Sequence, residues 1–255
     1  LVRPALARLV CTFTLAWQVF ADAPVVVAAN RDEAIDRPSE PPAVRDWEVG
    51  VLAPVDREAE GTWLGYNEFG VLVAITNRWV DANLPAERSR GLLVRDALAH
   101  ETAEDAVRFV ERELAARSYD GFNLVVVDAN AAVLLEWDGH LAVRNFDPGV
   151  HVVVNVGADG DYVVPAHRPD VGEQQAVNAD QVLTALQPEP GETSEEWLDR
   201  AAAVVADHEY GVCVHGDGYG TRSSTLLHLG ENRRTVRHAE GPPCETPYES
   251  VEGSV

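Results

Sequence analysis

One segment near the start of the chain, Cys11-Thr12-Phe13-Thr14-Leu15-Ala16-Trp17-Gln18, sets the architecture together with the apolar run Val25-Val26-Val27-Ala28-Ala29. Both are rich in β-forming and apolar side chains, and Ala21-Asp22-Ala23 between them supplies a short turn. Residues 11–18 and 24–29 are therefore predicted to be two paired β-strands. Asn30-Arg31-Asp32-Glu33 ends the second strand, so its polar side chains are expected beside Cys11.

The rest of the chain alternates between groups of strands and pairs of helices. Asn67-Glu68-Phe69-Gly70 and Asp138-Gly139 are hairpin turns, while Ser89 and Thr102 are suitable helix N-caps. The predicted strands are 61–66, 71–77, 122–128, 132–137, 140–146, 150–155, 211–216 and 222–229, and the predicted helices are 90–100, 103–115, 178–187 and 194–207.

This alternation predicts an α+β fold in which packed sheets are covered by helices. A single domain is expected over residues 11–240, with a proline-marked loop through Pro38, Pro41 and Pro42. Residues 241–255 form a tail rich in proline, glycine and acidic side chains, and this tail is expected to add no core.

The balance of charge limits the class of function. The 255 residues carry 20 basic and 42 acidic side chains, a net charge of −22, and every basic residue is arginine. Such a surface repels phosphate backbones and anionic headgroups, which argues against binding of nucleic acid or membranes. It suits a salt-rich cytoplasm, where screening over about 3 Å at 1 M relieves self-repulsion. We therefore predict a halophilic, cytoplasmic protein without a membrane span.

Cys11 is significant because of its place in the chain. The sequence contains no methionine, and translation from an alternative start codon at Val10 would leave Cys11 at the N-terminus after removal of the initiator. A terminal cysteine carries both a nucleophilic thiol and an α-amine, whose pKa of about 7.7–8.0 suits a general base. Residues 1–10 are thus predicted to be a leader absent from the mature protein, which would lie over or beside the pocket where it is retained.

Two other interpretations of this end of the chain are open. Cys11 is an ordinary buried strand residue if the leader is genuine, and a signal peptide cleaved near Ala21-Asp22-Ala23 would remove Cys11 altogether. Polar Thr12, Thr14 and Gln18 interrupt the apolar run, which argues against the signal peptide. The three scattered cysteines indicate a reducing compartment rather than a disulfide framework.

The histidines and the remaining cysteines do not predict a metal site. Cys213 and His215 have the spacing of two ligands, yet residues two apart on a strand also share one face in ordinary packing. There is no CxxC pair of the kind that binds zinc. Solvated surface positions are expected for His100, His140, His208 and His238.

Several polar motifs interrupt the apolar strands. Asn77 closes the run Ala74-Ile75-Thr76, where its amide can cap a turn or donate to an oxyanion. The chain also contains, in this order with the motifs already quoted, Gly61-Thr62-Trp63-Leu64-Gly65, Ser89-Arg90-Gly91, Tyr119-Asp120-Gly121-Phe122-Asn123 and Tyr219-Gly220-Thr221-Arg222-Ser223-Ser224-Thr225. Together, from residue 11 to about 229, these motifs resemble the NRDE family, also called the Transport and Golgi Organisation 2 family.

The resemblance implies a four-layer αββα sandwich similar to N-terminal nucleophile hydrolases. It implies that Cys11 is the nucleophile, that Asp32 is the partner of its α-amine, and that Asn77 donates to the oxyanion. Asn155 would be a second polar group in the pocket, and Arg222 an electrostatic member. The expected substrate-binding residues are Asn30, Arg31, Trp63, Tyr219 and Ser223. By similarity to cysteine acylases, the thiol would attack a non-peptide acyl amide of a small molecule, without a cofactor.

A second class of function stays open at this point. The family resemblance also implies links to haem mobilisation and to acyl-CoA or lipid handling, in which case the pocket would bind without catalysis. Arg222 and Arg31 would then hold propionates or phosphates, and a cysteine or histidine would contact iron. A family member with neither activity is the third possibility.

Overall fold

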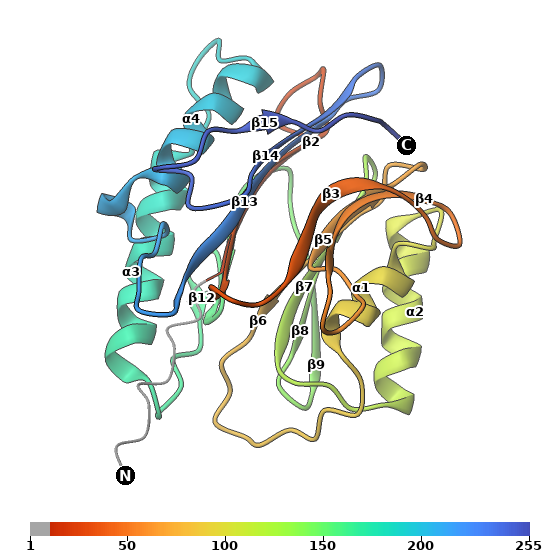
Figure 1. The fold of residues 1–255 in the computed structure, drawn as a ribbon, viewed down its shortest axis with the longest axis vertical. Helices are drawn as coiled ribbons and strands as arrows, with labels where there is room; N and C mark the ends of the chain where they lie inside the picture. The colour runs from red at the N-terminus through yellow and green to blue at the C-terminus, as the bar shows by residue number, and fades with distance from the viewer. Residues whose placement is uncertain (1–10) are drawn as a thin grey trace.

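The computed structural model describes residues 11–255, which form two antiparallel β-sheets stacked face to face between two pairs of helices (Figure 1). The predicted leader at residues 1–10, and its expected position beside the pocket, lie outside the described residues. Among the described residues, none of the helices combines the length and apolar character required to cross a bilayer.

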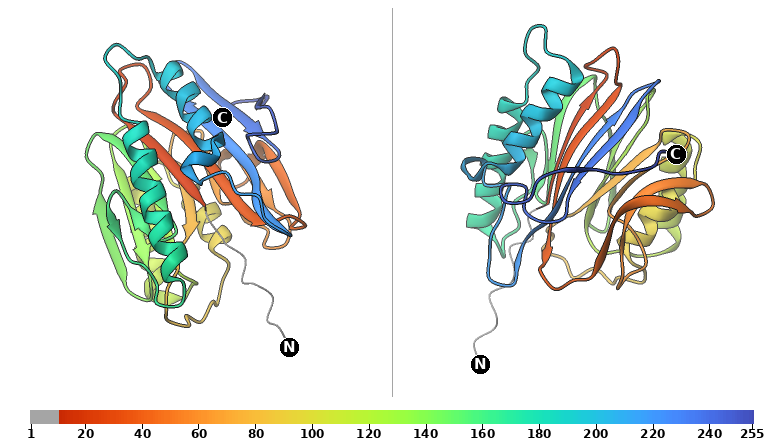
Figure 2. Two further views of the ribbon diagram at one scale, coloured as in Figure 1. Left: turned by 90° about the vertical axis from the view of Figure 1, so that its left-hand side faces the viewer. Right: turned by 45° about the horizontal axis from the view of Figure 1, so that its top comes forward.

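The first sheet contains the strands from both ends of the described chain. It consists of β1 (Thr12–Trp17), β2 (Val25–Ala34), β10 (Gly149–Val154), β11 (Gly157–Ala158), β12 (Asp161–Tyr162), β13 (Tyr219–Leu229), β14 (Arg234–Ala239) and β15 (Glu249–Ser250). Their order across the sheet is β12-β11-β10-β1-β2-β13-β14-β15, so β1 and β2 lie at its centre. Helices α3 (Pro169–Ala185) and α4 (Ser194–Ala206) cover its outer face (Figure 2).

The second sheet is built from the middle of the chain. It consists of β3 (Ser39–Asp46), β4 (Gly50–Asp56), β5 (Leu64–Asn67), β6 (Leu72–Asn77), β7 (Phe122–Val127), β8 (Ala132–Trp137) and β9 (Leu141–Asn145), which lie side by side in chain order. Helices α1 (Arg90–Ala97) and α2 (Ala103–Ala116) cover its outer face. The predicted α+β sandwich of four layers is confirmed.

The side chains of β1 and β2 contribute to the apolar clusters on both faces of their sheet. Phe13, Leu15 and Trp17 of β1 point into the core between the sheets, whereas Val26 and Ala28 of β2 pack under α3 and α4. Successive side chains of a strand face opposite ways, and both faces are apolar here because both are covered. Burial of a side chain the size of leucine or phenylalanine stabilises the fold by about 1.5–3 kcal/mol.

Two corrections to the predicted elements bear on the pocket. Strand β2 does not end at Ala29 as predicted but continues through Glu33 to Ala34, because β13 pairs with it along this length. The polar tetrad therefore lies inside a sheet rather than in a turn. The predicted proline-marked loop is the edge strand β3, where a bulge between Glu40 and Ala43 accommodates two prolines.

The C-terminal third also departs from prediction. Residues 211–216 are not a strand, because Gly211 takes a left-handed φ of 64° after a short 3-10 helix, His208–Tyr210. The tail does contribute to the core, since Val251 and Val255 pack against the inter-sheet cluster. His238 lies on β14 and is buried, not exposed. Helix α3 begins earlier than predicted, at Pro169, which fits the first turn because its ring fixes φ.

Candidate active site

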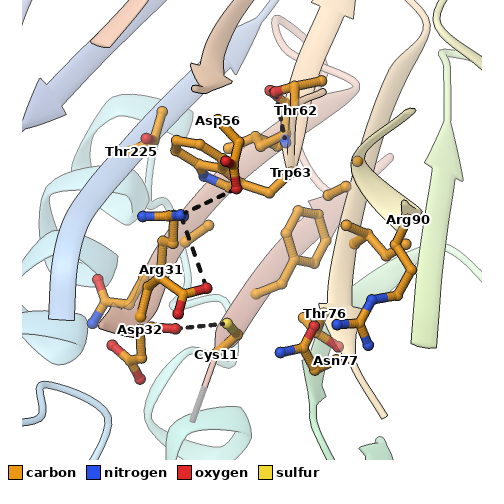
Figure 3. Close-up of a pocket in the computed structure, with 18 of the residues that line it drawn as sticks. Cys11, Arg31, Asp32, Asp56, Thr62, Trp63, Thr76, Asn77, Arg90 and Thr225 are labelled. Atoms are coloured by element: carbon orange, nitrogen blue, oxygen red, sulfur yellow. Dashed lines mark hydrogen bonds and ion pairs between the residues drawn. The ribbon is translucent and has the colours of Figure 1, made fainter. Parts of the chain in front are cut away.

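Strand register brings the predicted nucleophile together with polar groups from both sheets. Thr12 of β1 pairs with Asn30 of β2, and Phe13 pairs with Val153 of β10. Cys11, one residue before β1, therefore lies beside Asp32 on one side and Asn155 on the other. Strand β6 of the facing sheet ends at Asn77, and Figure 3 shows Cys11 between Asp32 and Asn77.

Asn155 holds the backbone nitrogen of Cys11. Its Oδ1 accepts a hydrogen bond from Cys11 N at 3.0 Å and another from Gln175 Nε2 at 2.9 Å. Its Nδ2 donates to the Asn77 carbonyl at 2.6 Å. Asn155 is fully buried, so this network sets the orientation of its amide. The residue lies behind the cysteine and is not among the residues that line the pocket, in contrast to its predicted place as a second polar group there.

Asp32 lies on the other side of Cys11. The Cys11 Sγ is 3.7 Å from the Asp32 carbonyl oxygen. The Asp32 carboxylate is buried; Oδ1 accepts a hydrogen bond from Thr221 Oγ1 at 2.6 Å, and Oδ2 has no hydrogen-bond partner among the described residues. Burial raises the pKa of the Asp32 carboxyl well above its usual value, while the Thr221 bond works against this increase.

The Cys11 thiol shares this desolvated environment. Burial, and after it the negative charge of Asp32, raise the pKa of the thiol to about 12. A thiol with such a pKa is protonated at neutral pH, and only the thiolate is strongly nucleophilic. Nucleophilic attack by such a thiol requires a base that removes its proton.

The pocket beside Cys11 has a volume of about 150 Å³ and lies between the two sheets. One wall is charged: the Arg31 guanidinium stacks 4.1 Å from the centre of the Trp63 ring and lies 3.8 Å from Asp56 and 4.0 Å from Glu33 (Figure 3). The rest of the lining includes apolar Phe13, Leu64, Ala74 and Ile75 and polar Thr76 and Asn77. A pocket of this kind suits a ligand with an apolar part and a polar part.

Asn77 is placed to act on a ligand. It lines the pocket, and its side-chain amide makes no hydrogen bond to another described residue, because only its backbone carbonyl is engaged by Asn155. Neighbouring Thr76 accepts a bond from Asn123 Nδ2, which also donates to the Val154 carbonyl. These bonds tie the end of β6 to β7 and β10, and thereby hold Asn77 opposite Cys11.

The other candidate residues divide into two groups. Asn30, Arg31 and Trp63 line the pocket, although the Asn30 amide points away from it and donates to the Val205 and Val212 carbonyls. Three residues of β13 do not line the pocket: Tyr219, Arg222 and Ser223. A register shift between Thr221 and Ser223 leaves Arg222 as an extra residue of β13 without a partner on β2.

Three residues of the site were not singled out from the sequence. Thr221 bonds Asp32, Gln175 bonds Asn155, and Arg90 lines the pocket and donates to the Gly121 carbonyl at 2.7 Å. Thr221 and Arg90 belong to recognised motifs, so their motifs were the available signal. Gln175 lies in the first half of α3, a part of the helix that was not predicted, and no local pattern marks it.

The carrier hypothesis required arginines for propionates or phosphates and an iron ligand. Arg31, Arg37 and Arg90 line the pocket, whereas Arg222 does not. Within residues 11–255 no histidine lines it, so Cys11 is the one side chain there that is a common axial haem ligand. Apart from the cysteine, the described site is therefore poorly matched to haem iron.

Comparisons with known proteins identify the family to which this sequence is similar. A family model described as Transport and Golgi organisation 2 matches residues 10–241. The human Transport and Golgi organization protein 2 homolog is 27% identical over 238 residues, which cover 80% of this chain and 81% of that protein. The mouse homolog is 32% identical over 112 residues, 42% of this chain and 40% of that protein.

Two solved structures share the architecture. Penicillin V acylase from Agrobacterium tumefaciens superposes with a TM-score of 0.58 at 16% identity, covering 90% of this chain and 83% of that one. The Caenorhabditis elegans ortholog of N-acylethanolamine-hydrolyzing acid amidase gives a TM-score of 0.56 at 13% identity, covering 86% of this chain and 92% of that one. At this level of identity the likeness establishes the fold alone.

Proposed function

The chain belongs to the Transport and Golgi organisation 2 family, and from this premise and the geometry around Cys11 we propose that it is a cysteine amidohydrolase of the N-terminal nucleophile type. Its substrate would be a small molecule with a non-peptide acyl-amide bond. The observation that carries the proposal is the anchoring of the Cys11 nitrogen by Asn155 at 3.0 Å, with the thiol beside Asp32 and Asn77 across the pocket.

The reaction would proceed through a thioester. The Cys11 α-amine takes the thiol proton, and Sγ attacks the amide carbonyl carbon. The Asn77 amide donates to the oxyanion of the tetrahedral intermediate, a contribution of about 3–4 kcal/mol for one well-placed donor. The C–N bond then breaks as the leaving nitrogen receives the proton. Water, deprotonated by the same amine, attacks the thioester, which releases the acid and restores the thiol.

The proposal requires that nothing precedes Cys11 in the active form. With a residue before it, the Cys11 nitrogen is an amide that donates its single hydrogen to Asn155 and has no basic lone pair. As a free amine, the same atom keeps that bond to Asn155 and gains a lone pair for the thiol proton. Asp32, whose carboxylate lies in the same desolvated region, would stabilise the amine when it becomes protonated.

The pocket walls indicate which amides would fit. Phe13, Leu64, Ala74 and Ile75 provide an apolar surface for an acyl group. A volume of about 150 Å³ is below the ~300–1,000 Å³ of pockets that enclose drug-sized ligands, so a short acyl chain or part of a longer one would be enclosed. The two structural neighbours are named penicillin V acylase and N-acylethanolamine-hydrolyzing acid amidase, and these names are consistent with an acyl-amide substrate.

The test uses two forms of the protein that differ only at the N-terminus. One begins with methionine followed by Cys11, so that methionine aminopeptidase exposes the cysteine; the other keeps one alanine before Cys11. Both are incubated with a panel of fatty-acyl and phenylacetyl amides, and release of amine is measured. We expect turnover with the exposed cysteine alone. Cys11→Ser and Asn77→Leu in the active chain should reduce turnover about 10²–10³-fold or more.

Trapping gives a second readout. Rapid acid quenching followed by intact-mass measurement should detect an acyl group on the peptide that contains Cys11. Equal turnover by the chain that keeps an alanine, or undiminished turnover by Cys11→Ser, would exclude the mechanism. Stoichiometric binding of haem without hydrolysis of any amide would favour the carrier function instead.

A further inference from the structure

A second group of reactive side chains lies outside the pocket. His208, Cys213, His215 and Cys244 each offer one ligand atom, and these four atoms all lie within 4.8 Å of one another. The first three come from the loop between α4 and β13, and Cys244 comes from the C-terminal tail, 29 residues beyond His215. Cys213 is buried, and the other three are exposed.

The measured separations resemble the edges of a zinc tetrahedron. Cys213 Sγ lies 3.5 Å from Cys244 Sγ and 3.9 Å from His215 Nε2, and His215 Nε2 lies 3.1 Å from Cys244 Sγ. With Zn–S of about 2.3 Å and Zn–N of about 2.0–2.1 Å, tetrahedral geometry requires sulfur–sulfur and sulfur–nitrogen edges of roughly 3.6–3.8 Å. These three atoms therefore lie within roughly 0.5 Å of one face of such a tetrahedron.

His208 is placed to supply the fourth vertex. Its ring centre lies 5.1 Å from that of His215, with the ring planes inclined by 59°. One of its ring nitrogens lies within 4.8 Å of the other three ligand atoms, and the exposed side chain has room to turn towards the open side of the triangle. We propose that His208, Cys213, His215 and Cys244 form a tetrahedral Cys2His2 site for a divalent zinc ion.

The ligand set determines the metal and the kind of site. Two thiolates and two imidazoles select zinc over the hard cations magnesium and calcium, which prefer oxygen ligands. Two thiolates neutralise the charge of Zn²⁺, so the site does not add an uncompensated charge. Four protein ligands leave no open position, which makes the site structural and separate from the chemistry proposed at Cys11.

The zinc would fasten two segments, the loop between α4 and β13 and the C-terminal tail, to the sheet that carries the pocket. Val214, between two of the ligands, exchanges hydrogen bonds with Thr221: its N–H donates to Thr221 Oγ1 at 2.9 Å, and its carbonyl accepts from Thr221 N at 2.8 Å. Thr221 in turn bonds Asp32. The metal site is thus connected to the candidate active site through a single residue on β13.

A disulfide between Cys213 and Cys244 is the alternative use of the same residues. The sulfur atoms are 3.5 Å apart, whereas a disulfide requires about 2.05 Å. A disulfide accounts for neither His208 nor His215. The zinc site uses all four side chains, and this difference provides the test.

The full chain is purified under reducing conditions, equilibrated with zinc sulfate, separated from free metal by gel filtration, and analysed for metal by inductively coupled plasma mass spectrometry. We expect about one zinc per chain, and loss of most of it in Cys244→Ser and His215→Ala. Cys11→Ser and His140→Ala should retain the metal, because Cys11 lies in the pocket and His140 is exposed away from the cluster. Far-ultraviolet circular dichroism checks that the variants fold.

Cobalt gives a readout that does not depend on any variant. Co²⁺ bound to the unmodified chain should give the intense visible bands of a tetrahedral ion, with thiolate-to-cobalt charge transfer in the near ultraviolet, and one equivalent of zinc should abolish both. Octahedral cobalt spectra, or zinc contents that are unchanged in Cys244→Ser, would overturn the proposal. The proposal would also be overturned if the intact mass of the reduced preparation were two hydrogens below that of the chain with free thiols, and if Cys244→Ser lacked this difference. That result would identify a disulfide.

Discussion

Thr221→Val tests how the fold maintains a buried carboxyl group beside Cys11. The substitution keeps the shape of the side chain and removes a hydroxyl that has two partners. The hydroxyl donates to Asp32 Oδ1 at 2.6 Å and accepts from Val214 N at 2.9 Å. Asp32 Oδ2 already has no partner among the described residues, so the variant leaves the whole carboxyl group without a side-chain donor there.

The expected cost follows from these two bonds. At a pH where Asp32 is ionised, a hydrogen bond to its carboxylate contributes about 1.5–3 kcal/mol, and an unsatisfied buried N–H costs about 1–3 kcal/mol. The free energy of unfolding should therefore fall by roughly 2.5–6 kcal/mol, a large part of the ~5–15 kcal/mol typical of a folded protein. Thr221→Ser keeps the hydroxyl and should lose less, since only a methyl group is removed.

The pH dependence of this loss has a definite sign. Burial raises the pKa of Asp32 above its unfolded value of 3.8, so the folded state keeps a proton that the unfolded state has released. Stability from this group is therefore present at acid pH and lost as pH rises through the window between the two pKa values. Removing the Thr221 bond raises the folded pKa further, because that bond favours the carboxylate, and extends the loss to higher pH.

Urea denaturation followed by tryptophan fluorescence, repeated from acid to mildly alkaline pH, measures both effects. The difference between Thr221→Val and Thr221→Ser should grow as the pH increases. If the two variants unfold with equal free energies at every pH, the hydroxyl does not stabilise the Asp32 carboxylate and the assignment of the bond is wrong.

Three other predictions concern separate parts of the molecule. Burial lowers the pKa of His238 to about 4, so the folded state keeps this imidazole neutral where the unfolded state protonates it. The free energy of unfolding should therefore fall by about 3 kcal/mol as pH decreases from about 6.5 towards 4. Urea denaturation of His238→Gln should show a smaller decrease over the same pH range. Gly61→Ala should lower the thermal midpoint by the equivalent of about 1–3 kcal/mol, because a Cβ at this position would meet the Gly91 backbone. Gly50→Ala is the control. A Cβ there has no neighbour closer than 3.6 Å, so the midpoint should change little. Removal of KCl should lower the thermal midpoint of the unmodified chain, because its net charge of −22 is then unscreened; an unchanged midpoint would contradict halophilic adaptation.

Much of the fold was predictable from local sequence. The runs at β1, β6 to β8 and β10 are apolar over the length of a strand and are separated by short turns, and Ser89 and Thr102 mark the starts of helices by capping them. The strand β3 was missed because two adjacent prolines normally interrupt a ladder. Only its place at the sheet edge, together with a bulge, makes them acceptable.

The candidate site was predictable to a lesser extent. The motifs identified Cys11, Asp32 and Asn77, which the structure brings together. They did not reveal that Asn155 would hold the Cys11 nitrogen from behind the pocket, or that Arg222 would fall at a bulge away from it. Both outcomes depend on strand register, which is set by pairing with distant segments and by turn geometry.

The amino-acid sequence by itself determined most of the helices and the central strands, the net negative charge, and the residue types available for chemistry, because these follow from composition and short-range periodicity. Only the tertiary structure decided which of those residues meet. Cys244 reaches Cys213 and His215, and Thr221 reaches Asp32 across 189 positions, because sheet packing brings together atoms whose proximity no local pattern encodes.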